Sequence, residues 1–120
     1  MEKAVVIIAT HGVEDPERAT IPFALGNASF AMDEKATVIL QAEGVFLAKK
    51  GYADGIHAGG FEPLRKLLDS FLDLGGQILV CAPCLKERNI GEADLIGQAK
   101  VVAGGTIINE CCNAKAVLSY

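Results

Sequence analysis

A chain of 120 residues with a formal net charge of −4 and 51% hydrophobic residues has the size of one globular domain, and we treat residues 1–120 as a single α/β unit. Its 11 basic residues form no cluster, which argues against nucleic acid as a partner. The apolar stretches 4–9 and 21–32 are shorter than the about 20 residues of a membrane span, and no leader-type cleavage pattern follows Met1, so we expect a cytoplasmic protein without a membrane partner.

The first two elements follow from local sequence. Residues 3–9 form a short continuous run of β-branched residues, typical of a strand covered on both faces. An Asp-Pro-Glu sequence at 15–17 has the cap, the proline and the first-turn acid of a helix start, and the helix is expected to reach about Met32. Pro22 clashes in a helix interior, so we expect either a kink there or a start near Thr20.

The rest of the chain alternates between strand and helix patterns. We predict strands over 36–40, 77–81, 100–102 and 116–119, and helices over 45–50, 62–74, 83–88 and 106–112. This alternation favours a parallel sheet with helices on both faces.

The predicted topology brings polar residues from distant parts of the chain to one edge of the sheet. His11 and Gly12 follow the first strand, Glu43 follows the second, and Cys81 and Cys84 follow the third. Ligand and active sites of parallel sheets form beyond the carboxyl ends of the strands. We therefore expect the candidate site at this edge.

The segment Cys81-Ala82-Pro83-Cys84 is the strongest chemical signal, because a Cys-x-x-Cys pair in a reducing compartment is more often reactive or metal-binding than a structural disulfide. Pro83 suits a first helical turn, where backbone N–H groups favour a thiolate. A helix end contributes only ~0.3–1 kcal/mol, whereas half-ionising a thiol at neutral pH takes about 2 kcal/mol. We therefore predict a second contributor, which is either further N–H donors or a cation: Lys86, Arg88 or protonated His11.

The chain resembles the DsrE/DsrF-like family over nearly its whole length. The resemblance is carried, in order, by Thr10-His11-Gly12, Asp15-Pro16-Glu17-Arg18, Gly44-Val45, Gly60, Pro63-Leu64, Leu67-Leu68, Gly75, Cys81-Ala82-Pro83-Cys84 and Arg88. It implies a three-layer sandwich around a mostly parallel sheet of about five strands. It also implies homo-oligomers, usually trimers or hexamers, and a sulfur-relay role in which Cys81 carries a persulfide and exchanges sulfur with donor and acceptor proteins.

Several alternatives remain open at the sequence level. A persulfide on one of the two cysteines could be attacked by the other, releasing sulfide and leaving a disulfide. The pair could instead serve a dithiol–disulfide oxidoreductase of the type loosely called peroxiredoxin-like. It could bind zinc together with His11, or be structural in a non-enzymatic oligomeric binding module. The sequence does not decide between a carrier and a sulfurtransferase.

The remaining candidates are weaker. His11 and Glu43 could each be ordinary loop residues, and the vicinal pair Cys111-Cys112 is assigned no role. Gly104-Gly105 lacks the complete glycine-rich pattern of a nucleotide-binding loop, and we expect no cofactor.

Overall fold

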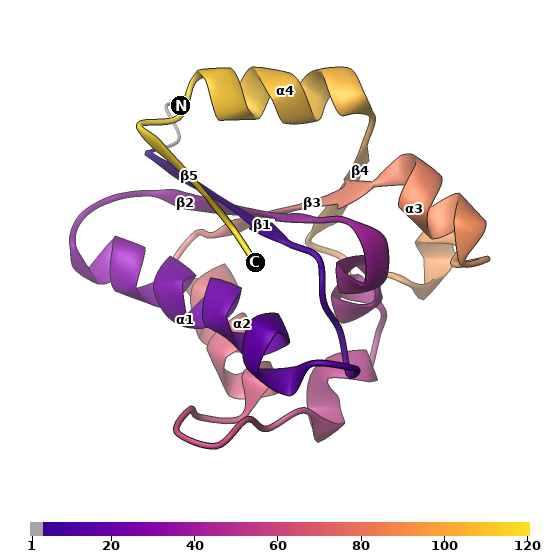
Figure 1. The fold of residues 1–120 in the computed structure, drawn as a ribbon, viewed down its shortest axis with the longest axis horizontal. Helices are drawn as coiled ribbons and strands as arrows, with labels where there is room; N and C mark the ends of the chain where they lie inside the picture. Colours follow the sequence, from indigo (N-terminus) through magenta and orange to yellow (C-terminus); the bar gives the residue numbers. More distant parts are fainter. Residues whose placement is uncertain (1–3) are drawn as a thin grey trace.

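The computed structural model describes residues 4–120 and shows a central sheet with helices on both faces (Figure 1). The five strands are β1 (Val5–Ala9), β2 (Ala36–Leu40), β3 (Gln77–Cys81), β4 (Ala99–Val102) and β5 (Ala116–Ser119). They lie in the order β4-β3-β2-β1-β5, and every pairing is parallel. The predicted α/β fold with a five-stranded sheet is confirmed; residue 3, the predicted start of the first strand, lies outside the described residues.

The helical segments divide between the two faces. The α-helices are α1 (Pro16–Ala31), α2 (Leu64–Asp73), α3 (Ala82–Glu87) and α4 (Gly104–Cys112), and the short 3-10 helices are η1 (Ala42–Ala48), η2 (Tyr52–Gly55) and η3 (Glu92–Asp94). Figure 1 shows α1 and α2 on one side of the sheet and α4 on the other. The three-layer arrangement follows from the long connection through α4, which carries the chain from one edge strand to the other.

The core lies between the sheet and the α1–α2 layer. Phe71 of α2 packs edge-on against Phe23 and Phe30 of α1, with ring centroids 5.8 and 6.0 Å apart. Gly26 permits this contact, because a Cβ there would lie 2.7 Å from the Phe71 ring. All five residues of β2 are buried, as its predominantly apolar and β-branched sequence predicts for a central parallel strand.

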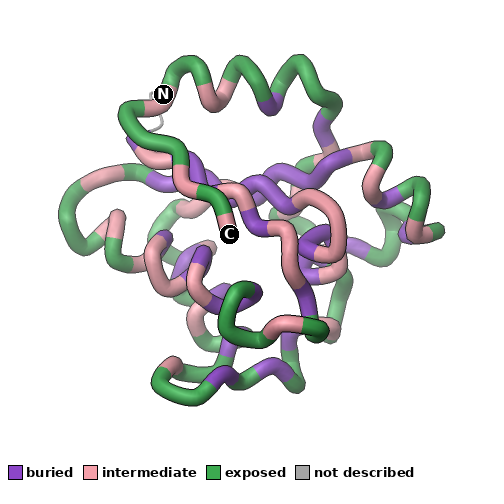
Figure 2. The backbone as a smooth tube through the Cα atoms, in the orientation of Figure 1, coloured by how far each residue is buried: buried purple, intermediate pink, exposed green. Residues whose placement is uncertain are grey.

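The opposite layer is thinner. Of the residues of α4 only Ile107 is buried, and Ile108 is 64% exposed. Figure 2 shows α4 and β5 mostly exposed, whereas the centre of the sheet is buried. Residues 4–120 therefore cover the second face of the sheet incompletely.

Most element boundaries differ from the sequence predictions by one or two residues, and three differences have a clear local reason. α1 begins at Pro16, with the Asp15 carboxylate accepting the Arg18 N–H (3.0 Å), and it continues through Pro22, so the later start near Thr20 is wrong. The predicted helix over 45–50 is the 3-10 helix η1, which begins earlier, at Ala42. α4 begins at Gly104, because Ala103 already has the extended conformation of an N-cap.

Within residues 4–120, no helix combines the length and the apolar character that a bilayer crossing requires.

Candidate functional site

The Cys81–Cys84 pair lies at the junction of β3 and α3. Cys81 is the last residue of β3 and the N-cap of α3, and Pro83 and Cys84 belong to the first turn of that helix. The two sulfur atoms are 2.9 Å apart, and the Cys84 thiol donates towards Cys81 Sγ. Both cysteines are free thiols, and the predicted position of the pair at the carboxyl edge of the sheet agrees with the structure.

The two thiols differ in environment. Cys81 is only 8% exposed, whereas Cys84 is half-buried. Burial raises the pKa of the Cys81 thiol, and so do the hydrogen bond to the Cys84 side chain and the charge of that residue. The Cys84 backbone N–H and the Arg88 charge lower it, but with less effect. The expectation that both thiols favour the thiolate is thus wrong for Cys81, because loss of water outweighs the helix terminus and the cation.

Cys84 has a backbone donor that the sequence did not identify. The Ala42 N–H donates to Cys84 Sγ across 3.3 Å. Ala42 lies two residues after the end of β2 and has a φ of +50°, a left-handed conformation that costs a non-glycine residue roughly 1–2 kcal/mol. A helix end alone contributes too little free energy to half-ionise a thiol, and this N–H is a second group that favours the thiolate. It acts on Cys84, the more accessible of the two thiols.

Arg88 and Glu43 connect the ends of β2 and β3. Arg88 Nε donates to Glu43 Oε1 at 3.0 Å, and Arg88 Nη1 donates to the Cys84 carbonyl oxygen at 3.2 Å. The Arg88 side chain is 23% exposed and that of Glu43 is 44% exposed. Arg88 therefore lies beside Cys84, and Glu43 reaches this region through its ion pair with Arg88, which partly neutralises the guanidinium.

The His11 ring contacts Thr10 and not the sulfur atoms. Its Nδ1 lies 3.1 Å from Thr10 Oγ1, which itself donates to the Tyr120 carbonyl oxygen at 2.7 Å. Since the hydroxyl proton is used on that carbonyl, Nδ1 carries the proton that joins the ring to Thr10. Neither thiol of the pair forms a hydrogen bond with His11 in the described part of the chain.

The zinc site considered from Cys81, Cys84 and His11 is not formed within one chain. No group of three or more His, Cys, Asp or Glu residues among residues 4–120 is arranged to hold a metal ion. The physical reason lies in the first loop, where the contact with Thr10 directs the His11 ring to its own strand end.

The backbone of Gly12 packs against the loop after β2 and against Tyr52. The Gly12 N–H donates to Glu14 Oε1 at 2.5 Å, and the next N–H, of Val13, donates to the Tyr52 hydroxyl at 2.8 Å. A Cβ on Gly12 would lie 2.6 Å from that hydroxyl and 3.1 Å from the Glu43 carbonyl oxygen. Glycine is therefore required here by close packing between the loops after β1 and β2.

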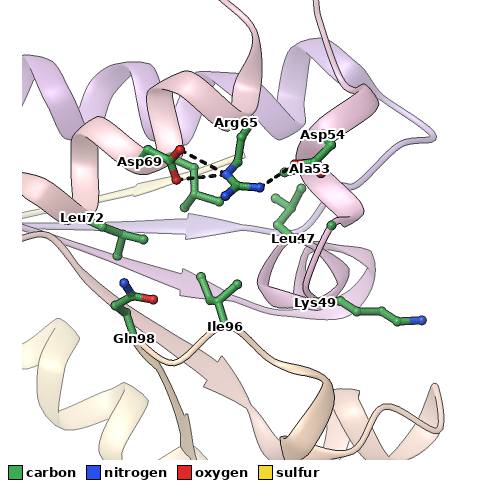
Figure 3. Close-up of a pocket in the computed structure, with 11 residues that line it drawn as sticks. Leu47, Lys49, Ala53, Asp54, Arg65, Asp69, Leu72, Ile96 and Gln98 are labelled. Carbon is green, nitrogen blue, oxygen red and sulfur yellow. Dashed lines mark hydrogen bonds and ion pairs between the residues drawn. The ribbon is translucent and has the colours of Figure 1, made fainter.

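Two further features lie outside the thiol site. Cys111 is half-buried and Cys112 is exposed on α4, and burial raises the pKa of Cys111. A cavity of about 110 Å³ lies between α2, η2 and the segment before β4 (Figure 3). Its Arg65 already binds Asp54 at 2.6 Å and Asp69 at 3.0 Å, which leaves little unpaired charge for a ligand. None of the predicted site residues lines this cavity.

Sequence reasoning did not identify Ala42 and Tyr52 as parts of the site region. Ala42 acts through its backbone N–H, for which its side chain gives no signal. Tyr52 comes from η2, a helix that was not predicted, and its hydroxyl reaches a loop 39 residues earlier in the chain.

Comparisons with known proteins identify the family to which this chain is similar over nearly its whole length. The model of the DsrE/DsrF-like family matches residues 3–120. Uncharacterized protein MJ0760 of Methanocaldococcus jannaschii is 30% identical over 86% of this chain, which spans only 38% of that relative. Uncharacterized protein MJ0989 of the same organism is 30% identical over 79% of this chain and 80% of its own length.

Solved structures share the fold. The YchN protein from E. coli superposes with a TM-score of 0.81 at 17% identity, covering 98% of this chain and 99% of its own. Protein MTH1491 from Methanobacterium thermoautotrophicum superposes with a TM-score of 0.72 at 14% identity, with complete coverage of both chains. At these identities the likeness concerns the arrangement of strands and helices.

Proposed function

Because this chain belongs to the DsrE/DsrF-like family, we propose that it is a sulfur-relay protein that holds sulfur as a persulfide on the Cys81–Cys84 pair. The observation that carries the proposal is the placement of two free thiols, 2.9 Å apart, at the carboxyl edge of a parallel sheet. One of them is half-buried and so remains open to a donor. Sulfur-donor and sulfur-acceptor proteins are the partners of such a carrier.

The loading step needs only a thiolate and a sulfane sulfur. A cysteine thiolate attacks the terminal sulfur of a donor persulfide, forms the new S–S bond, and expels the donor thiolate. The thiolate is the reactive form, so backbone donors to the sulfur favour the step. The Ala42 N–H supplies such a donor at 3.3 Å from Cys84 Sγ.

Mass spectrometry tests this function. The reduced wild type and the single variants Cys81→Ser and Cys84→Ser are incubated with glutathione persulfide, then alkylated and weighed as intact chains. We expect a gain of one sulfur atom in at least one of these three proteins and none in the Cys81→Ser/Cys84→Ser double variant. The Cys111→Ser/Cys112→Ser variant is the matched control and should react as the wild type does, because it retains the Cys81–Cys84 pair. Absence of added sulfur from all three proteins rejects the proposal.

The sulfur–sulfur separation also supports a second function, a dithiol–disulfide oxidoreductase. A disulfide bond is about 2.05 Å long, so only a small movement converts the thiol pair into a disulfide. An oxidoreductase of this kind reduces a model disulfide catalytically and has a reduction potential within the range of cellular dithiols. A stoichiometric but non-catalytic reaction with the model disulfide decides against this function.

We further propose that copies of this chain associate through α4 and β5 in a homo-oligomer, such as a trimer or hexamer. Ile108 on α4 is 64% exposed and Val117 on β5 is 44% exposed. β5 pairs only with β1 and so leaves one edge of the sheet open. A second copy of the chain would cover these apolar groups, and a reducing cytoplasm is the compartment in which the thiols would remain free.

A further inference from the structure

The two thiols of the site are unequal in their access to a donor. Cys81 closes β3 and is 8% exposed, within the apolar cluster of the core. Cys84 lies one helical turn further on α3 and is half-buried. An incoming persulfide is a bulky molecule whose terminal sulfur must meet the attacking sulfur in line. Access therefore favours Cys84 as the first thiol to react.

The hydrogen bonds around Cys84 favour the same assignment. Its sulfur accepts the Ala42 N–H at 3.3 Å and faces Cys81 Sγ at 2.9 Å. A proton kept on Cys81 turns the second contact into a donor to a Cys84 thiolate, and burial favours that proton by raising the Cys81 pKa.

On the basis of the proposed function, we propose that Cys84 accepts the sulfane sulfur and that Cys81 then discharges it as sulfide. In the second step, the Cys81 sulfur attacks the inner sulfur of the Cys84 persulfide. The Cys81–Cys84 disulfide forms, the bond to the outer sulfur breaks, and that atom leaves as hydrosulfide. The Cys81 proton goes to this leaving group or to water.

The electrons balance without an external reagent. Two thiols are oxidised to one disulfide, and the sulfane sulfur is reduced to sulfide. A new cycle requires a dithiol reductant, which restores both thiols by thiol–disulfide exchange. The chain would thus be a persulfide reductase with one buried and one accessible thiol, and not only a carrier.

The short sulfur–sulfur distance is the structural reason for the second step. The attacking Cys81 sulfur already lies 2.9 Å from the Cys84 sulfur, against about 2.05 Å in a disulfide. Cys81 therefore reaches the inner sulfur with little rearrangement of the chain. A cysteine that only fills space in the core would not need a second thiol at this distance.

The experiment separates loading from discharge. Reduced wild type, Cys81→Ser, Cys84→Ser and the double variant receive glutathione persulfide anaerobically. Hydrosulfide release is measured above the level of the double variant, and alkylated chains are weighed. Both cysteines lie on one tryptic peptide, between Lys66 and Lys86, so the single variants assign the sulfur. Far-UV circular dichroism verifies that each variant is folded.

We expect the wild type to release one hydrosulfide per chain and to become a Cys81–Cys84 disulfide. Cys81→Ser should keep one added sulfur and lose the release, and Cys84→Ser should load at least ten-fold more slowly. Equal loading of the two single variants, or faster loading of Cys84→Ser, overturns the assignment of the acceptor. A wild type that keeps its added sulfur without a disulfide overturns the discharge step and leaves the proposed function intact. No added sulfur and no hydrosulfide in any protein overturns both.

Discussion

Cys81 illustrates how one buried residue links the chemistry of the site to the stability of the chain. Its pKa is raised by burial, by the hydrogen bond to Cys84 and by the charge of that residue, whereas an unfolded chain exposes the thiol to water. The folded chain therefore holds the proton at pH values where the unfolded chain releases it. The contribution of Cys81 to the free energy of unfolding is complete below the ordinary thiol pKa and falls as the pH rises above it.

This sign gives a pH prediction. Urea unfolding at neutral and alkaline pH should show the free energy of unfolding of the wild type decreasing as the pH passes the range of free thiols, about 8.5 and above. In Cys81→Ala the decrease should be smaller. Cys111, whose pKa is also raised by burial, adds a decrease of the same sign, so Cys111→Ala serves as the comparison. Identical pH profiles of wild type and Cys81→Ala contradict the predicted linkage.

The conformation of the loop after β2 depends on a close approach between Gly44 and the end of β1. A Cβ at this position in η1 would lie only 2.1 Å from the Ala9 carbonyl oxygen at the end of β1. The loop carries both the Ala42 N–H and the Glu43 carboxylate to the site. The missing side chain of Gly44 therefore positions two of the groups around the thiols.

We predict that Gly44→Ala costs about 3 kcal/mol of the free energy of unfolding, because backbone must move to admit the methyl group. Gly55→Ala is the matched control, since a Cβ at Gly55 would meet nothing within 4 Å. Chemical denaturation measures both. A loss for Gly44→Ala that does not exceed that of Gly55→Ala contradicts the close approach.

The register of β2 and β3 places two buried polar side chains at paired positions. Thr37 pairs with Gln77 across the two strands. Thr37 Oγ1 and Gln77 Oε1 are both buried and have no hydrogen-bond partner among residues 4–120. A buried polar atom without a partner costs about 1–3 kcal/mol relative to its hydrated state.

Replacing the hydroxyl by a methyl of similar size should recover part of this cost. We predict that Thr37→Val raises the free energy of unfolding by about 1 kcal/mol. Thr20→Val is the contrasting variant, because the equally buried Thr20 hydroxyl donates to the Pro16 carbonyl oxygen at 2.7 Å and should lose stability on substitution. A destabilised Thr37→Val would mean that the hydroxyl has a partner, such as a bound water.

The sequence predicted elements where a local signal decides them. The mainly apolar, β-branched run of β2 and the Asp15 cap of α1 were sufficient for a buried strand and a helix start. Pro22 was misleading, because the helix accommodates it after its first turn. The strand order likewise placed Glu43 and the two cysteines near one edge of the sheet, but the same argument expected His11 beside the thiols, whereas its ring contacts Thr10. The Ala42 donor and the raised Cys81 pKa could not be predicted, since both depend on backbone conformation and burial in the assembled fold.

At the scale of the whole molecule, the two faces of the sheet are covered unequally. Among residues 4–120, α1 and α2 pack together over one face, whereas α4 lies on the other and buries only its Ile107. A sheet of parallel strands is normally covered on both faces, because its strands are apolar on both sides. The exposed Ile108 and Val117 are the apolar groups that an added chain would remove from water.

The proposed self-association therefore predicts an effect of charge at this surface. Ile108→Glu should lower the oligomeric state measured by sedimentation velocity, because a carboxylate would have to be buried at the interface. Met32→Glu is the matched control, since Met32 is 75% exposed at the end of α1, in the other layer. We expect this control to sediment like the wild type. A monomeric wild type contradicts the proposed self-association. An Ile108→Glu variant that keeps the wild-type oligomer shows that α4 is not in the interface. In that second case, Val117→Lys tests whether β5 forms the interface.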